Sequence, residues 1–257
     1  MGGKAFNEKY AIQRVNKEVS HAILSIVKRN LDYEHSAVGN TENVLLELMQ
    51  DTGDVDIIIN ADKNELFEKL SNVKACVDKR KIANNILTVF SYGGSFYQVD
   101  FMTTSNVKLG KWLMKGNPDP NGVKGAMRNM LFCMLCKHLS DFATKENVIN
   151  TKISLSFPGL LRVVSNSADG KININESITD VRAIRSALRL STNVRKFDFN
   201  TFESVVDYLI ENDIYNNNEL QKRFVEYTEK SWVAKSMPAE LEKAIEYIKG
   251  KKVSGDS

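Results

Sequence analysis

Three aspartates are the residues of this chain whose type and spacing are best suited to chemistry. Asp54 and Asp56 stand two residues apart at the start of an Ile-rich run, and Asp100 lies in a second apolar run, residues 97–102. Side chains alternate along a strand, so Asp54 and Asp56 are expected on one face. Three carboxylates a few ångströms apart repel one another unless a divalent cation lies between them. The sequence therefore predicts a Mg²⁺ site for chemistry on phosphates.

The elements that would position these aspartates follow from the apolar pattern in the first half of the chain. Helices are predicted over residues 7–31, 42–49 and 60–70. Strands are predicted over residues 36–38, 54–59, 85–92 and 96–102. The turn Gly93-Gly94-Ser95 joins the last two strands as a hairpin. The aspartates are thus expected on neighbouring strands.

The second half of the chain has a different character. A Gly/Pro/Asn-rich loop at residues 116–122 marks the expected domain boundary. Beyond it, helices are predicted over residues 126–139, 178–190, 201–212 and 218–235, with β-leaning runs around Ala168-Asp169-Gly170. We therefore predict an α/β (α+β) protein with a mixed sheet in residues 1–116, a mainly helical region over residues 117–250 and a frayed tail from 251 to 257.

Composition limits the class of protein. The chain has 257 residues, 42% of them hydrophobic and 26% charged, which is enough to bury a core without metal or disulfide support. No apolar run is long enough to span a bilayer, and the start lacks the apolar core of a signal peptide, so a cytoplasmic protein is expected. The net charge of +3 does not by itself indicate a nucleic-acid binder.

Two further groups of residues suit phosphate binding. The turn Gly39-Asn40-Thr41 precedes a predicted helix, whose unpaired N–H groups and positive dipole end favour the phosphates of a triphosphate. Lys124 and Arg128 lie four residues apart on one helical face, where both can grip a triphosphate or a nucleic-acid backbone.

A third group suits an acceptor. Arg182, Arg185 and Arg189 form a stripe opposite an apolar face and are candidates for lining an acceptor groove.

Simpler explanations remain open for each group. Asp54 can merely follow Gly53 in a turn, and Asp100 can be an acid on an edge strand that faces water. The Gly39 turn can serve only as a strand-to-helix connection with Asn40 as the helix cap. The basic residues also fit a solvated helix end and a charged outer face. Cys133 and Cys136 lack a second ligand pair, so buried thiols are favoured over zinc.

Three motifs in order carry a family resemblance. Gly39-Asn40-Thr41, Asp54-Val55-Asp56 and Gln98-Val99-Asp100 resemble the polymerase-β-type nucleotidyltransferase superfamily. The segment 124–129, which opens an apolar helix, is similar to a segment in nucleotidyltransferases of tailed bacteriophages. Asn40 stands where the superfamily usually has Ser or Gly, and Thr41 follows as a substitute hydroxyl.

The resemblance implies a polymerase-β-like fold and an enzyme with Mg²⁺ or Mn²⁺ held by Asp54, Asp56 and Asp100. Its substrate would be a nucleoside triphosphate, bound by Gly39, Asn40, Thr41, Lys124 and Arg128. The nucleoside monophosphate would pass to an acceptor hydroxyl, with an RNA end favoured over a protein or a small molecule, and pyrophosphate would leave. For a phage-encoded protein the location would be the cytoplasm of the bacterial host. The alternative is a non-catalytic nucleotide- or nucleic-acid-binding module that retains the fold.

Overall fold

The structure is a computed structural model that describes residues 5–83, 85–147, 150–157, 159–165, 172–190 and 198–251. The chain divides into two compact units, Met1–Pro120 and Asn121–Ser257. The division falls in the loop in which the sequence analysis placed the domain boundary. Each unit is described below by itself.

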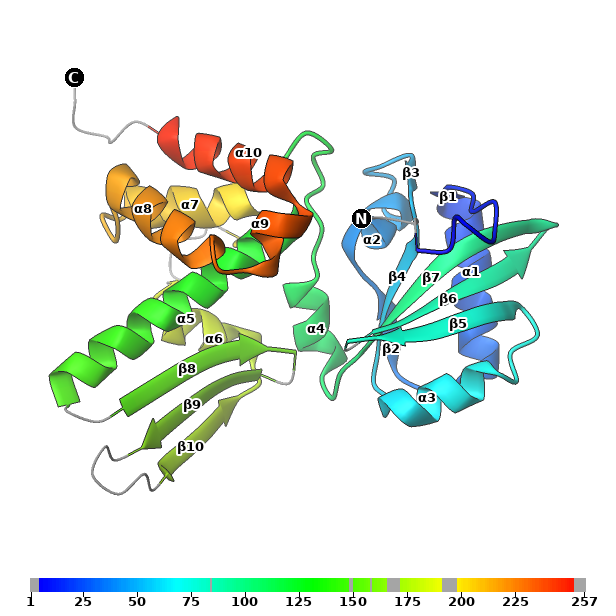
Figure 1. Cartoon of the computed structure of the whole chain (residues 1–257), viewed down its shortest axis with the longest axis horizontal. Helices are drawn as coiled ribbons and strands as arrows, with labels where there is room; N and C mark the ends of the chain where they lie inside the picture. The colour runs from blue at the N-terminus through cyan, green and yellow to red at the C-terminus, as the bar shows by residue number, and fades with distance from the viewer. Residues whose placement is uncertain are drawn as a thin grey trace. The chain divides into compact units, whose positions relative to one another are not determined.

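The first unit is built around a five-stranded sheet (Figure 1). Its elements are β1 (Val15–Asn16), α1 (Lys17–Asn30), β2 (His35–Ala37), α2 (Gly39–Leu45), β3 (Asp51–Thr52), β4 (Val55–Ile59), α3 (Lys63–Leu70), β5 (Cys76–Ile82), β6 (Asn85–Tyr92), β7 (Ser95–Thr103) and α4 (Val107–Leu113). The strand order is β2-β4-β7-β6-β5, in which β4 and β7 are parallel and the other pairs antiparallel. The mixed sheet of an α/β protein is thus confirmed.

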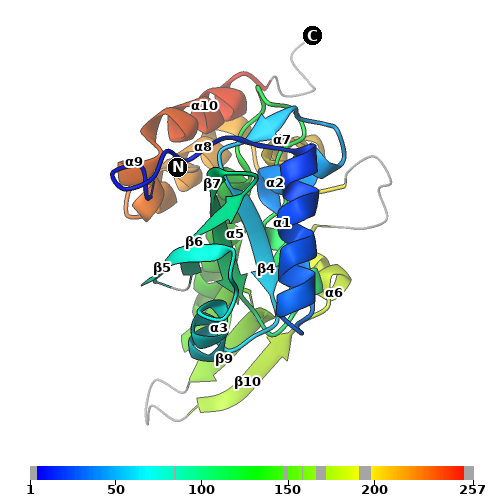
Figure 2. The same ribbon diagram turned by 90° about the vertical axis from the view of Figure 1, so that its right-hand side faces the viewer.

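One face of this sheet packs against α1 and α3 (Figure 2). Alternate residues of β4 point into that core, where Val55 and Ile57 lie with Ile23 and Val27 of α1. Helix α1 begins later than predicted, because the Asn16 side chain accepts a hydrogen bond from the N–H of Val19 and caps the helix. The prediction of a helix from residue 7 was therefore wrong for residues 7–16.

The other face of β4 carries Asp56 and Ile58, since side chains alternate along the strand. Helix α4 covers Ile58 at close range. A Cβ atom on Gly110 would lie 1.9 Å from Cδ1 of Ile58, so only glycine fits at this position of the helix. Close packing thus covers one part of this face, and the carboxylates occupy the neighbouring part.

The second unit combines helices with a three-stranded sheet. Its elements are α5 (Gly125–Asn147), β8 (Asn150–Ser156), β9 (Gly159–Ser165), β10 (Ile172–Ile178), α6 (Val181–Ala187), α7 (Phe202–Glu211), α8 (Asn217–Thr228), α9 (Trp232–Ser236) and α10 (Pro238–Lys249). The strands are antiparallel in the order β10-β9-β8. On α5, Ser140 Oγ accepts a hydrogen bond from Ile153 N of β8 at 2.8 Å. Phe202 contacts the rings of Phe224 and Tyr247, and these contacts join α7, α8 and α10.

Several element predictions are confirmed, and others need correction. The hairpin of β6 and β7 forms at Gly93-Gly94, as predicted. Helix α2 begins at Gly39 rather than at residue 42, and the predicted helix 218–235 is broken at residues 229–231 between α8 and α9. The predicted turn at residues 168–170 lies outside the described residues. Within the described ranges, none of the helices has both the length and the apolarity that crossing a bilayer requires.

Candidate metal centre

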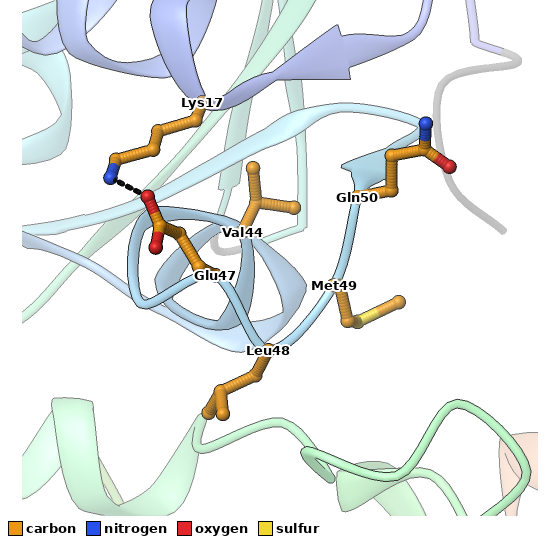
Figure 3. A pocket seen from close by; sticks show the side chains of 6 residues that line it. All are labelled: Lys17, Val44, Glu47, Leu48, Met49 and Gln50. Carbon is orange, nitrogen blue, oxygen red and sulfur yellow. Dashed lines mark hydrogen bonds and ion pairs between the residues drawn. The ribbon is translucent and has the colours of Figure 1, made fainter.

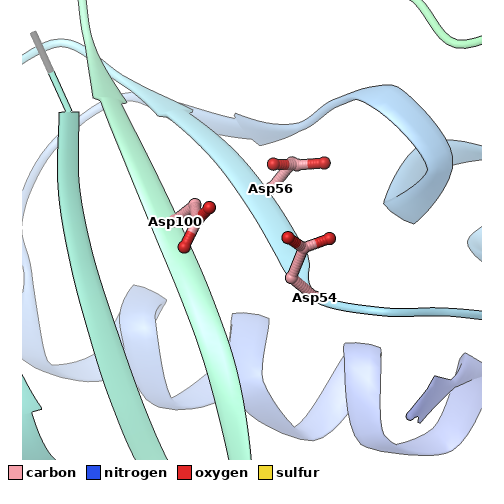
Figure 4. A group of neighbouring side chains, drawn as sticks. All are labelled: Asp54, Asp56 and Asp100. Atoms are coloured by element: carbon pink, nitrogen blue, oxygen red, sulfur yellow. The ribbon is translucent and has the colours of Figure 1, made fainter. Parts of the chain in front are cut away.

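The three aspartates meet on the open part of the first unit's sheet (Figure 4). Asp56 on β4 and Asp100 on β7 are register partners in the parallel pair, so their side chains leave the sheet side by side. Asp54 lies in the bend just before β4. One oxygen from each carboxylate lies within 4.8 Å of the others, which no other set of three His, Cys, Asp or Glu side chains among the described residues achieves. The sequence prediction that these aspartates converge is thus confirmed.

Burial and mutual repulsion shape the electrostatics of these carboxylates. Burial, with the charges of Asp54 and Asp100, raises the pKa of Asp56 well above its usual range. Burial and the charge of Asp54 also raise the pKa of Asp100 to about 7, although a hydrogen bond from Gln98 opposes the shift. The charged form of both groups is thus disfavoured relative to an exposed aspartate. A divalent cation bound by carboxylate oxygens would reverse this preference.

Thr41 links the glycine turn to the strand that carries the acids. Its hydroxyl accepts a hydrogen bond from Asp56 N at 2.8 Å and lies 3.3 Å from Asp54 O, to which it can donate. The side chain is fully buried. The prediction that this hydroxyl substitutes as a phosphate contact is therefore wrong, because its hydrogen bonds hold the backbone of Asp54 and Asp56.

The Gly39 turn lies directly against the Asp56 carboxylate. Gly39 has φ +61°, and a Cβ atom there would lie 3.1 Å from Oδ2 of Asp56. Its N–H donates to Met114 O at 2.9 Å. Gly116 packs behind it, where a Cβ atom would lie 2.8 Å from the Gly39 carbonyl carbon. The turn therefore needs glycine for both its conformation and its closeness to the carboxylate.

Asn40 does not occupy the helix-cap position that the simpler explanation of the Gly39 turn assigned to it. Val38 occupies the N-cap position of α2, without a side-chain hydrogen bond, so Asn40 is not the helix cap. Asn40 stands instead in the first turn of the helix, partly exposed. Backbone N–H groups in a first turn have no acceptor within the helix, so this turn offers donors beside Asp56.

Lys124 and Arg128 belong to the second unit and have partners there. Lys124 Nζ pairs with Glu240 at 3.2 Å while remaining about half exposed, at 53%. Arg128 is fully buried and donates to Asn200 O at 2.5 Å, and burial lowers its pKa to about 9. Arg128 therefore does not reach solvent, contrary to the prediction that it grips a triphosphate.

The three arginines predicted to line an acceptor groove do not form one helical stripe. Helix α6 ends at Ala187, and Arg189 follows it in a left-handed conformation with φ +60°. Arg185 donates to Asp198 O at 2.8 Å and lies over the ring of Phe199. Arg182 is exposed on α6. Only Arg182 and Arg185 share the helix, so the predicted stripe is wrong at Arg189, and the acceptor role stays a prediction.

The two cysteines of α5 lie inside the second unit. Cys136 is buried and Cys133 is partly buried. Burial raises the pKa of Cys136 to about 12 and also raises that of Cys133. Buried thiols of a protein core have these properties. The sequence analysis also favoured buried thiols over zinc.

Two surface pockets lie apart from the aspartates. One, of about 430 Å³, is in the first unit and is crossed by an ion pair between Lys17 and Glu47 (Figure 3). The other, of about 350 Å³, lies between α5 and α8 of the second unit. Neither is lined by the three aspartates. The candidate site is therefore defined by its converging carboxylates.

Two polar residues at the site were missed by the sequence analysis. Gln98 donates from Nε2 to both oxygens of Asp100, and Asn43 donates from Nδ2 to Asn117 O, beside Gly116. Gln98 carried a usable signal, because a residue two positions before an acid on a strand shares its face. Asn43 carried none, since its partner is 74 residues away.

Comparisons with known proteins place this chain in no group. No model of a known protein family matches it. A search of curated proteins also finds no match.

Proposed function

We propose that the chain is a divalent-cation-dependent nucleotidyltransferase with a polymerase-β-like first unit. The observation that carries this proposal is the convergence of Asp56 and Asp100 on adjacent parallel strands with Asp54 in the bend just before β4, beside the glycine turn at Gly39. The order of these parts along the chain is the order of the superfamily motifs that the sequence resembles.

The donor set fits Mg²⁺ or Mn²⁺. Carboxylate oxygens are the hard ligands that these ions prefer, and three of them within 4.8 Å can share one ion or a close pair of ions. Asp54, Asp56 and Asp100 would hold the metal. When bound, it would supply neutralisation of the charge that develops on the phosphate oxygens.

The remaining steps belong to residues of the chain. The oxygen of an acceptor hydroxyl attacks the α-phosphorus, the bond to the β-phosphate oxygen breaks, and pyrophosphate leaves. Asp100 would help to activate that hydroxyl by taking its proton. The backbone at Asn40, which is partly exposed in the first turn of α2, would contact the β- and γ-phosphates. An RNA end is the favoured acceptor, ahead of a protein or a small molecule.

The test is transfer of label from each α-labelled nucleoside triphosphate, with Mg²⁺ or Mn²⁺, to total RNA and cell lysate. Wild type and Asp32→Ala should transfer label, because Asp32 is an exposed residue outside the site. The double variant Asp54→Ala/Asp56→Ala should transfer none. Equal transfer by the double variant, or no transfer by folded wild type under any condition, would overturn the proposal.

A non-catalytic binding module is the second candidate. The observation that favours it is the buried Thr41 hydroxyl, whose hydrogen bonds are made within the protein where a phosphate contact was expected. Such a module should bind nucleotide or nucleic acid in a salt-dependent way, and Asp54→Asn/Asp56→Asn should leave that binding intact. An enzyme should lose metal-dependent nucleotide binding in the same variant.

A further inference from the structure

Gln98 is the immediate neighbour of Asp100 on the site face of β7. Its Nε2 lies 2.9 Å from Oδ1 and 3.2 Å from Oδ2 of Asp100, so one amide group contacts both carboxylate oxygens. Gln98 is almost completely buried, at 1% exposure. A buried amide held between two carboxylate oxygens has little freedom to turn, and it restricts the carboxylate in the same way.

The other end of the Gln98 amide is also held. Its Oε1 accepts a hydrogen bond from the backbone N–H of Ala5 at 3.0 Å. This contact fixes which end of the amide faces Asp100, because the oxygen accepts from Ala5 and the nitrogen donates to the acid. The hydrogen bonds thus run from Ala5 through Gln98 to Asp100.

Ala5 is held by the segment that follows it, residues 6–13. Phe6 is buried, and the guanidinium of Arg80 lies over it, 4.2 Å from the centre of the Phe6 ring. The ring of Tyr10 lies 5.1 Å from that of Phe96, near the start of β7. Gln13 N donates to Phe96 O at 2.9 Å. The segment is therefore anchored at several points to β5 and β7, so the N–H of Ala5 is supplied by an ordered part of the first unit.

We propose that Gln98 is a positioning residue for the Asp100 carboxylate, and that the N-terminal segment 5–13 is part of the metal site through the Ala5 N–H. The inference rests on the proposed metal site. A carboxylate whose orientation is set in advance loses less freedom when it binds a cation. Groups that orient metal ligands commonly change metal affinity by about 10- to 100-fold when they are removed.

The test compares Gln98→Met with Thr88→Val in the full chain. Methionine keeps the length of the side chain and removes the hydrogen bonds to Asp100 and from Ala5. Thr88 is a matched control, since it is also fully buried in this sheet and its hydroxyl donates to Val99 O at 2.7 Å, but it does not contact the aspartates. Calorimetric titration with Mn²⁺ should show a Kd that is about 10- to 100-fold higher for Gln98→Met and unchanged for Thr88→Val. Thermal unfolding in EDTA would report any loss of stability separately.

A second pair of variants tests the same inference without altering the buried glutamine. Ala5→Pro removes the N–H that Gln98 accepts, whereas Ala5→Gly keeps it. Ala5→Pro should weaken Mn²⁺ binding and Ala5→Gly should not, even if Gln98→Met fails to fold. In the variants that still transfer label, kcat should decrease, whereas KM for the nucleotide should stay near the wild-type value.

The outcomes separate this inference from the proposed function. Wild-type Mn²⁺ affinity in both Gln98→Met and Ala5→Pro would overturn the inference and leave the metal site standing. Failure of the wild type to bind Mn²⁺ would overturn both. Weaker binding in these variants, from a wild type that transfers no label, would support the inference and count against nucleotidyl transfer.

Discussion

Asp100 stands at a position where the folded chain disfavours the charged form of a carboxyl group. Its pKa is raised from 3.8 to about 7 by burial and by the charge of Asp54. The folded state therefore binds a proton on Asp100 over a pH range in which the unfolded state does not. Without metal, Asp100 therefore contributes most to stability when the pH is below its pKa in the unfolded state. This contribution is lost as the pH rises through its pKa in the folded state.

Asp100→Asn should remove this pH dependence. In EDTA, the variant should be more stable than wild type by about 1–3 kcal/mol near pH 8, with the difference shrinking towards pH 4. Urea unfolding at several pH values measures this, with Asp32→Asn as an exposed control. A variant that is less stable than wild type by the same amount at pH 8 and at pH 5 would contradict this interpretation.

Sequence reasoning at the scale of residues succeeded where local geometry decides the outcome. Asp56 and Asp100 were each placed on a strand because the apolar pattern and side-chain alternation are local signals, whereas the parallel pairing of β4 with β7 joins segments distant in the sequence. The role of Thr41 depends on the backbone of Asp54 and Asp56, which belongs to another element, and spacing alone does not reveal it. Arg128 was misjudged because arginine is usually exposed, and here a backbone carbonyl compensates part of the cost of its burial.

At the scale of elements, the contact between α4 and β4 closes one end of the site face. Gly110 is the point of closest approach, since a Cβ atom would lie 1.9 Å from Cδ1 of Ile58. Alanine in a helix normally stabilises relative to glycine by about 1 kcal/mol. At this position the steric clash should outweigh that gain.

Gly110→Ala should therefore destabilise the protein by about 1–3 kcal/mol. Ile58→Val removes the clashing methyl group, so the double variant should recover most of the loss. Urea unfolding of the two single variants and the double variant would measure the coupling. Equal stability of Gly110→Ala and wild type, or simple additivity in the double variant, would show that α4 does not pack on β4 in this way.

The elements that sequence analysis missed also have physical reasons. Strand β5 contains Lys79, Arg80 and Lys81 and lies at the sheet edge, so it has neither the apolar run nor the clean alternation of a typical strand. The predicted helix 218–235 ends early because Thr228 and Ser231 form local hydrogen bonds at the break. Such a break in a helix is hard to predict from the sequence, because the apolar pattern continues through it.

At the scale of the whole molecule, the residues of the candidate metal centre all belong to one of the two units. Asp54, Asp56, Asp100, Gly39 and Gln98 all belong to Met1–Pro120. Lys124 and the arginines of the predicted acceptor groove belong to Asn121–Ser257. The metal and the triphosphate are therefore proposed for the first unit alone, and the acceptor role of the second unit's arginines stays a prediction.

The most direct measurement is a crystal structure of the full chain grown with Mn²⁺ and a non-hydrolysable nucleoside triphosphate analogue, with anomalous data collected at the manganese edge. The account predicts one or two manganese peaks bound by Asp54, Asp56 and Asp100, with the triphosphate reaching the turn at Gly39. Ordered aspartates with no manganese among them, or an analogue bound away from them, would contradict the central claim.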